Sequence, residues 1–190
     1  AERTAAEARV AGVQAWTVAA DLEKPAQVER LFGQARNLAG KRICFLVNNA
    51  SVFPAGRLGG LTAADLTRNI QINAFAPLQL SRQFARQFRQ PAAGLRPCIL
   101  NLLDCRVADH DQEHAAYHLS KRLLWDLTHM LALEFAPAVR VNAVAPGLIL
   151  PPAGKGEAYL RRLARTNPLR FHGSADDIAE AVLFLLKSRF

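Results

Sequence analysis

Short apolar segments alternate with longer helical patterns along this chain, and that alternation restricts its fold more than any other feature. The apolar segments are predicted as strands at residues 13–20, 43–47, 98–103 and 139–144. The helical patterns cover residues 2–11, 25–38, 62–90, 115–135, 157–166 and 175–186. Strands that alternate with helices pack as a parallel sheet with helices on both faces. The sequence therefore predicts an α/β chain with a Rossmann-like, doubly wound parallel sheet.

The composition is that of a globular protein with enough apolar residues for a core. The 190 residues are 51% hydrophobic and predict one domain over residues 1–190. No apolar run approaches the length of about 18 residues that a membrane helix needs, and no signal peptide is visible. The three cysteines suit free thiols in a reducing compartment. We therefore expect a cytoplasmic protein without a membrane segment.

The net charge of +8 is spread over many segments and does not form one basic block. Nucleic-acid binding favours clustered Lys and Arg residues with interleaved aromatic side chains, and the sequence has no such motif. A positive surface also attracts small anionic ligands such as a dinucleotide phosphate. We therefore expect a small-molecule partner and no nucleic-acid partner.

Tyr117 and Lys121 lie four residues apart near the start of the predicted helix at 115–135. Residues at i and i+4 share one face of a helix, so the phenol and the ammonium group can point into the same cleft. A nearby cation lowers the pKa of a phenol from its ordinary value of about 10. The pair is therefore a candidate acid–base group.

Three further motifs accompany this pair. Asn-Asn-Ala-Ser at residues 48–51 follows an apolar run, and Asn73 stands in an Ile-Asn-Ala sequence. The sequence Arg-Val-Asn-Ala-Val-Ala-Pro-Gly covers residues 140–147. In their order and spacing the four motifs resemble those of the short-chain dehydrogenase/reductase family. The resemblance covers nearly all of the chain and implies hydride transfer from a nicotinamide cofactor.

Departures from the usual family pattern are similar to those of its pteridine reductase branch. Where most of the family has a serine before the tyrosine, this chain has Asp104. Ser51 replaces a glycine, Phe53 follows it, and residues 146–152 look like the substrate loop of that branch. The resemblance implies reduction of a pterin of the dihydropteridine or dihydrofolate type.

The same resemblance implies catalytic roles for four residues. Tyr117 would donate the proton, while Lys121 would bond the nicotinamide ribose and hold down the pKa of the phenol. Asn73 would order a proton-relay water near Lys121. A buried aspartate needs a hydrogen-bond partner, so Asp104 is expected to bond Tyr117 and to help protonate a pterin nitrogen. The alternative role for Asp104 is to cap the loop that follows its strand.

The cofactor implied by the family is NADPH, and NADH is not excluded because the segment that chooses between them is not recognised. The residues expected to contact the cofactor are Asp21, Leu22, Asn48, Ala50, Ser51, Tyr117, Lys121, Pro146 and Gly147. The expected substrate-binding residues are Ser51, Phe53, Asp104, Tyr117 and Leu148. Phe53 would stack on the pterin ring, or alternatively pack as an ordinary loop aromatic.

Parts of the family's domain have no counterpart in the sequence. The first residues already form a helical pattern, so the N-terminal strand–helix–strand unit and its glycine-rich phosphate turn are not found. The last strand of the family is missing too. We expect a truncated domain in which the strands at 13–20 and 43–47 lack a pairing partner and expose apolar edges. Such a fragment would bind cofactor weakly and be inactive or poorly soluble.

Two other functions remain open. The chain could be a generic carbonyl reductase acting on a ketone or a 3-oxoacyl thioester, although Asp104 disfavours this unless it is protonated. It could also be a non-catalytic fragment that binds no cofactor. Because the family is usually tetrameric, a homotetramer is expected for the full-length protein, with residues 62–90 and 115–135 forming an interface.

Histidines and acidic residues are concentrated around the start of the predicted helix at 115–135. They are Asp109, His110, Asp111, Glu113, His114 and His118. The four-residue spacing of His114 and His118 could suit zinc on a helix. However, the predicted helix begins only near residue 115, and the family has a loop here. We therefore expect solvated side chains and no metal.

Overall fold

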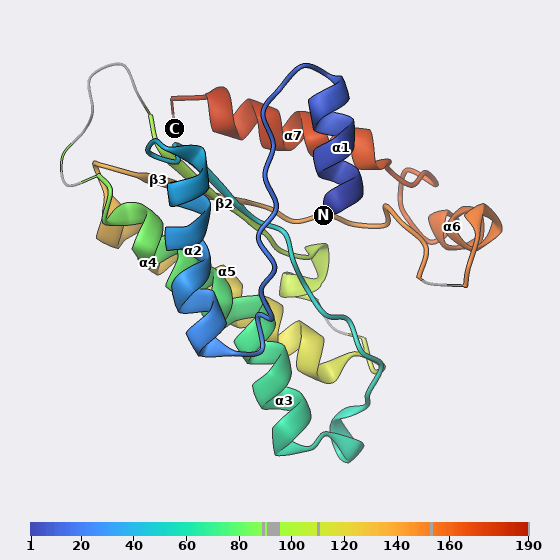
Figure 1. Cartoon of the computed structure of the whole chain (residues 1–190). Coiled ribbons are helices and arrows are strands. Elements are labelled where there is room, and N and C mark those ends of the chain that lie inside the picture. The colour runs from blue at the N-terminus through green and yellow to red at the C-terminus, as the bar shows by residue number, and fades with distance from the viewer. Residues whose placement is uncertain (89, 91–95, 110, 153, 190) are drawn as a thin grey trace.

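The computed structural model describes the chain except for residues 89, 91–95, 110, 153 and 190 (Figure 1). Its three strands are β1 (Phe45–Asn48), β2 (Cys98–Leu102) and β3 (Arg140–Val144). They form a parallel sheet in the order β1-β2-β3, with Cys98 opposite both Phe45 and Arg140. The predicted parallel α/β sheet is therefore confirmed, and its carboxyl ends all meet at one edge.

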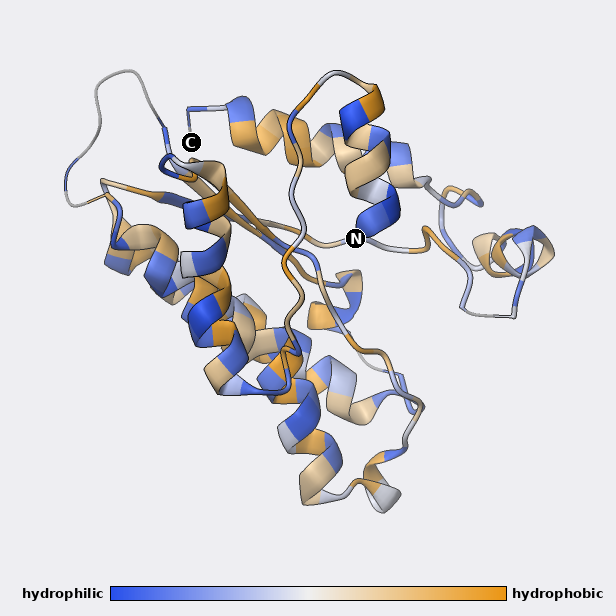
Figure 2. Ribbon diagram, viewed as in Figure 1, coloured by the Kyte–Doolittle hydropathy of each residue, from blue (hydrophilic) through white to orange (hydrophobic). Residues whose placement is uncertain are grey.

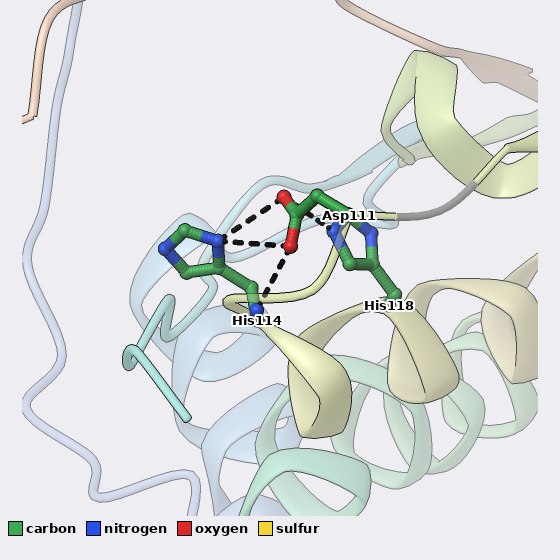
Figure 3. Close-up of side chains that lie close together, drawn as sticks. All are labelled: Asp111, His114 and His118. Carbon is green, nitrogen blue, oxygen red and sulfur yellow. Dashed lines mark hydrogen bonds and ion pairs between the residues drawn. The ribbon is translucent and has the colours of Figure 1, made fainter. Parts of the chain in front are cut away.

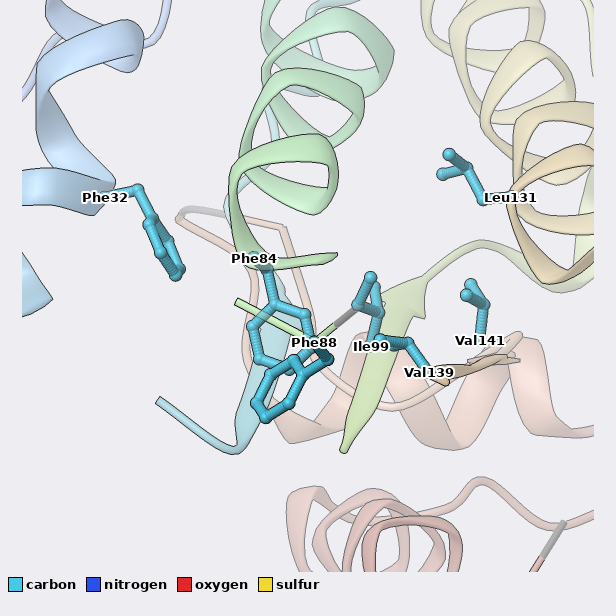
Figure 4. Close-up of a cluster of buried hydrophobic side chains, with 7 residues drawn as sticks. All are labelled: Phe32, Phe84, Phe88, Ile99, Leu131, Val139 and Val141. Carbon is cyan, nitrogen blue, oxygen red and sulfur yellow. The ribbon is translucent and has the colours of Figure 1, made fainter. Parts of the chain in front are cut away.

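Seven α-helices surround this sheet in the described residues. They are α1 (Glu2–Val10), α2 (Pro25–Ala39), α3 (Ala63–Ile70), α4 (Ala76–Ala85), α5 (Ala115–Phe135), α6 (Glu157–Ala164) and α7 (Ala175–Lys187). Helices α2, α4 and α5 lie on one face of the sheet, and α7 lies on the other (Figures 1 and 4). Two capping boxes, at Thr62 and Ser174, begin α3 and α7. The sheet thus has helices on both faces, as predicted.

The main apolar core lies between the sheet and the α2–α4–α5 face. It contains Phe32, Phe84, Phe88, Ile99, Leu131, Val139 and Val141 (Figure 4). The ring of Phe84 is fully buried and meets Phe32 edge to face, with ring centroids 6.3 Å apart. All five residues of β2 are buried, because this central strand is covered on both faces. The core fixes β2 and α5 relative to each other, and these two elements carry the site.

The long helix predicted over residues 62–90 is instead divided into α3, a π-helical turn η2 (Gln71–Phe75) and α4. Pro77 explains the break, because proline has no N–H to donate to the carbonyl of Asn73, four residues earlier. A π-turn widens the helix by one residue and is frequent at functional sites. The predicted helical span is confirmed over residues 63–85, and the π-helical turn within it was not predicted.

Residues 13–20 were predicted as a strand, but they form no ladder with the sheet. An extended segment becomes a strand only when a neighbour satisfies its backbone groups. The predicted exposure of apolar residues is confirmed in both segments. Val13 and Trp16 of the first segment are 56% and 45% exposed, and Phe45 of β1 is 45% exposed. The segment at 43–47 differs from the expectation, since β1 pairs with β2 along its other edge.

Helix α7 carries many hydrophobic residues (Figure 2). Of these, Leu183 and Phe184 are 50% and 60% exposed. Within the described part of the chain, no helix combines the length and the apolar character needed to cross a membrane.

Candidate active site

Asp104 and Tyr117 meet at the carboxyl edge of the sheet. Asp104 comes two residues after the end of β2, and Tyr117 lies in the first turn of α5. The Tyr117 hydroxyl donates a hydrogen bond to Oδ2 of Asp104 at 2.8 Å. Asp104 Oδ1 also accepts from the backbone N–H of Arg106, so it caps its own loop as well. The two roles considered for this aspartate therefore occur together.

The phenol of Tyr117 is only 7% exposed. Burial raises the pKa of Tyr117 well above its ordinary value, and the adjacent Asp104 raises it further. The expectation that Lys121 would lower this pKa is wrong for this structure, because the Lys121 Nζ lies 5.8 Å from the ring centroid while the Asp104 carboxyl touches the hydroxyl. Tyr117 is consequently protonated at neutral pH and can act as a proton donor.

Lys121 is 3% exposed, and its Nζ donates to the carbonyl oxygen of Leu102 at 2.7 Å. Burial lowers the pKa of Lys121 to about 8, and the charge of Asp104 opposes that shift only in part. A lysine ammonium has three N–H donors, so two remain for other acceptors. The side chain is thus held one helical turn beyond Tyr117, on the same side of α5.

Asn73 joins η2 to two other elements through its side chain. Its Oδ1 accepts from the backbone N–H of Val52 at 2.9 Å and from the Ser51 hydroxyl at 3.1 Å. Its Nδ2 donates to the Val52 carbonyl at 3.0 Å and to the Ser120 hydroxyl at 2.9 Å. Two donors and two acceptor sites are the full capacity of an amide side chain. The side chain therefore positions the chain after β1, and a relay water would need a different partner.

The backbone carbonyl of Asn73 is a candidate for that partner. Pro77 has no N–H to donate to this carbonyl, as an α-helix would require. Sequence reasoning placed Asn73 at the site and expected it to order a relay water, without naming the atom that would do so. The interruption at Pro77 was the signal that pointed to the carbonyl.

Phe53 lies beside the acid–base pair. Its ring stacks on His114, with centroids 3.9 Å apart and planes at 12°, and meets the Tyr117 ring edge to face at 4.5 Å. A short bridge holds this arrangement: the backbone N–H of Gly56 donates to Glu113, and that of Ala115 donates back to Gly56. Phe53 is still 50% exposed. The ring is fixed in place, with half of its surface available to a planar ligand.

Apart from Ser51, Tyr117 and Lys121, the residues predicted to contact the cofactor fall into two groups. Leu22, Asn48 and Ala50 line a cavity of about 280 Å³ between α2, α4 and β1. The amide of Asn48 points inward, however, and donates to Asn101 Oδ1 at 2.8 Å within the buried chain Asn48–Asn101–Thr128. The Asn48 amide therefore links the ends of neighbouring strands and is not directed at a ligand in the cavity.

The second group follows β3 and the extended segment. Pro146 accepts a backbone hydrogen bond from Cys105 at 2.9 Å, which places the turn at Pro146 and Gly147 beside Asp104. Leu148 is part-buried and accepts from Gly173. Asp21 is exposed, with an ion pair to Lys24 at 3.6 Å, and no described contact joins it to Tyr117.

Sequence reasoning did not single out Ser120, and it did not foresee that the ring of His114 stacks on Phe53. Ser120 is fully buried, accepts from Asn73 and donates to the Tyr117 carbonyl at 2.7 Å. Its position next to Lys121 was the available signal. The prediction of solvated side chains was wrong for His118, which is 5% exposed. His110, also named in that group, lies outside the described residues.

A nicotinamide dinucleotide fits the part of the site that this chain describes. The two remaining N–H groups of Lys121 can bond ribose hydroxyls, and a glycine at 147 leaves the backbone open to close approach. No tight glycine-rich turn joins a strand directly to a helix in the described residues, so they include no phosphate cradle of that kind.

A protein-family model described as enoyl-(acyl carrier protein) reductase matches residues 1–190. A short-chain type dehydrogenase/reductase of Picea abies is 31% identical over 182 residues, covering 92% of this chain and 65% of the relative. Dihydromonapterin reductase of Klebsiella pneumoniae is 28% identical over 145 residues, covering 76% of this chain and 60% of the relative. The chain thus spans less than two thirds of the length of these curated relatives.

Among solved structures, that of FolM alternative dihydrofolate reductase 1 from Brucella canis, complexed with NADP, superimposes with a TM-score of 0.86. It is 30% identical, and the match covers 99% of this chain and 72% of the other. The fold and the site define a Rossmann-like α/β protein with a tyrosine–lysine pair at the carboxyl edge of its sheet. The chain belongs to the short-chain dehydrogenase/reductase family, as its motifs predicted.

Proposed function

We propose that the full-length protein reduces a pterin of the dihydropteridine or dihydrofolate type, with Tyr117 as the proton donor and NADPH as the hydride source. The observation that carries this proposal is the 2.8 Å hydrogen bond from Tyr117 to Asp104. Hydride addition to a C=N bond requires a proton at the nitrogen. The protonated phenol supplies that proton, and the carboxyl group holds the phenol in place.

The bound dinucleotide supplies the hydride. Lys121, fixed by the Leu102 carbonyl, orients the ribose with its remaining donors. The Brucella canis relative is complexed with NADP, which supports NADPH as the cofactor. Pro146 and Gly147 flank the nicotinamide end, and Leu22 and Ala50 line the cavity that we assign to the adenine end.

The aspartate favours a pterin over a ketone. A carbonyl oxygen develops negative charge during reduction, and a neighbouring carboxylate would oppose that charge. A pterin presents ring nitrogens that accept protons and an amino group that donates to a carboxylate. Half-exposed Phe53 offers a ring face on which a flat heterocycle can stack. Ser51 and Leu148 complete the substrate side in this proposal.

A homotetramer is proposed for the full-length protein, through the helices predicted at the interface. Large apolar side chains remain exposed on η2 and α5, among them Phe75 at 48%, Met130 at 63% and Leu133 at 82%. Burial of such residues stabilises subunit association. Light scattering on the full-length protein gives the subunit number, and a monomer would contradict this arrangement. A cytoplasmic location is likewise proposed and agrees with the free cysteines.

The test of the function is NADPH oxidation by the full-length protein with dihydrobiopterin, dihydrofolate and a 3-oxoacyl thioester in parallel. Turnover of the pterins alone is the expected result. Turnover of the thioester alone would make the protein a carbonyl reductase, and no turnover of any substrate would favour a non-catalytic role. NADH in place of NADPH gives the cofactor preference in the same assay.

A further inference from the structure

Three side chains around the start of α5 converge on one point (Figure 3). Asp111 Oδ2 lies 3.2 Å from Nδ1 of His114 and 3.0 Å from Nε2 of His118. One ligand-type atom from each residue lies within 4.8 Å of the other two. His114 and His118 are one helical turn apart, and Asp111 approaches from the preceding loop. The arrangement thus brings two imidazoles and one carboxylate together at the rim of the active site.

The His118 side chain is 6% exposed, yet neither ring nitrogen makes an aligned hydrogen bond within the described residues. A buried polar group without a partner is costly by about 1–3 kcal/mol. The close contact of Nε2 with the Asp111 carboxylate lacks the alignment of a hydrogen bond, and a cation shared between these two groups would bind both.

The carboxyl group of Asp111 is ionised at neutral pH. The loop also orients the carboxylate, since Oδ1 accepts from the backbone N–H groups of Glu113 and His114 at 2.7 and 2.9 Å. Asp111 is consequently a charged, oriented oxygen donor.

His114 is fixed before any ligand arrives. Its ring is stacked on Phe53, and the neighbouring backbone is tied to Gly56. Ligands held in this way lose little conformational freedom when a metal binds. The cluster is therefore a pre-formed set of donors.

We propose that Asp111, His114 and His118 bind one divalent transition-metal ion of the zinc class. Two imidazoles and a carboxylate are a ligand set typical of zinc with one position left for water. In a tetrahedral site with bonds of about 2.0–2.2 Å, neighbouring ligand atoms lie roughly 3.3–3.6 Å apart. The two separations from Asp111, 3.0 and 3.2 Å, need to open only slightly, while the two imidazole nitrogens lie within 4.8 Å of each other. This site is separate from the proton-transfer pair and does not depend on the substrate proposed above.

The metal would fasten the loop before α5 to the helix that carries Tyr117. His118 follows Tyr117 directly, and their rings lie 5.4 Å apart. The His114 ring supports Phe53 on the other side. Binding is therefore expected to order the substrate-side wall of the cleft.

The test uses tag-free, full-length protein treated with a chelator and then titrated with Co²⁺. The expected result is one equivalent of Co²⁺ per chain, with the visible absorption of a tetrahedral site, displaced by Zn²⁺. Loss of a partner that only orients a ligand weakens metal affinity by about 10–100-fold, so loss of a ligand should weaken it by at least about 100-fold. That loss is expected in His118→Gln and in Asp111→Asn.

The matched control is His129→Gln. His129 lies on the same helix, is exposed, and bonds only the Trp125 carbonyl through Nδ1 among its described contacts. The His129→Gln variant should bind Co²⁺ with the same affinity as the unmodified protein. If His118→Gln does not fold, as judged by circular dichroism without metal, Asp111→Asn provides the result, because Asp111 lies in a part-exposed loop. Absence of stoichiometric Co²⁺ binding, or equal binding by the folded variants, would overturn the proposal.

Discussion

Asp104 accepts a hydrogen bond from Tyr117 across 2.8 Å, so these two residues hold one proton between them. Burial and the neighbouring carboxyl group both raise the pKa of the phenol. Where most of the family places a neutral serine, this chain places an acid. The pair therefore retains its proton at neutral pH, as a reductase needs when it donates that proton to substrate.

Replacing the acid by its amide should lower the pKa of Tyr117. In Asp104→Asn the side chain keeps its size but loses its negative charge, so the phenolate is opposed mainly by burial. Ultraviolet difference titration measures the phenolate directly, and a Tyr159→Phe background removes the second tyrosine of this chain. The midpoint for Tyr117 should move down relative to the protein with Asp104 intact. An unchanged midpoint would mean that the carboxyl does not control the phenol.

Asp104→Ser should separate the two classes of substrate. Serine restores the hydrogen-bond donor that suits a carbonyl and removes the acid that suits a pterin nitrogen. We expect kcat/KM for dihydrobiopterin to fall by at least about tenfold, a loss of about 1.4 kcal/mol, while turnover of a ketone does not fall below its level in the unmodified protein. Equal losses on both substrates would remove the reason for preferring a pterin.

Tyr117→Phe should remove most turnover and leave cofactor binding nearly unchanged. The proton donor is lost, which lowers kcat by about 10²–10⁴-fold, while Lys121 keeps its contact with Leu102. Fluorescence titration with NADPH checks the binding, and steady-state kinetics on the full-length protein check the turnover. Undiminished turnover would show that another group donates the proton.

Asn73 and Ser120 should be energetically coupled. Asn73→Ala leaves the Val52 backbone and the Ser120 hydroxyl without their partner, and we expect a loss of about 2–4 kcal/mol in the free energy of unfolding. Ser120→Ala removes one end of the same network. A double-mutant cycle in urea should give a coupling energy of about 0.5–3 kcal/mol. Exposed Asn37→Ala serves as the control and should change stability little.

Local patterns predicted most of the elements but not the pairing between them. Helix α5 was predicted at its observed bounds, and Thr62 and Ser174 form capping boxes at the starts of α3 and α7. These signals are contained within a few consecutive residues. Whether residues 13–20 join the sheet depends on a neighbouring strand, which the segment's own pattern cannot reveal. The π-turn at η2 was missed because Pro77 was not weighed against the helical periodicity around it.

The sequence predicted which residues form the site, but it predicted their protonation and burial only in part. The pairing of Asp104 with Tyr117 was foreseen from the resemblance to the family, in which Asp104 takes the place of the usual serine. The direction of the phenol pKa was not, because it depends on whether the carboxyl or the Lys121 ammonium lies nearer, and sequence spacing does not give that distance. The burial of His118 was missed for a similar reason. It follows from how the loop at Asp111 folds back over α5.

Lys121→Met should stabilise the folded protein at neutral pH while it removes the proposed ribose contact. The folded-state pKa of Lys121, about 8, lies below its ordinary value of 10.5, so the unfolded chain binds this proton more tightly. Stability is therefore lost as the pH falls from 10.5 towards 8, and the loss is complete below pH 8. At 1.36 kcal/mol per pKa unit it amounts to about 3 kcal/mol, offset in part by the broken bond to Leu102.

Methionine has no proton to lose and carries no such penalty. The free energy of unfolding of the variant, relative to that of the unmodified protein, should therefore be about 2–3 kcal/mol higher at pH 7 than at pH 10. Urea unfolding at both pH values measures the difference, and comparison at the same pH cancels the contribution of Tyr117. Lys155→Met is the control, because Lys155 is exposed and should show no such dependence on pH. A gain of equal size at both pH values would mean that Lys121 is not held with a lowered pKa. The expected result would mean instead that the fold tolerates a destabilising buried amine, which a catalytic role explains.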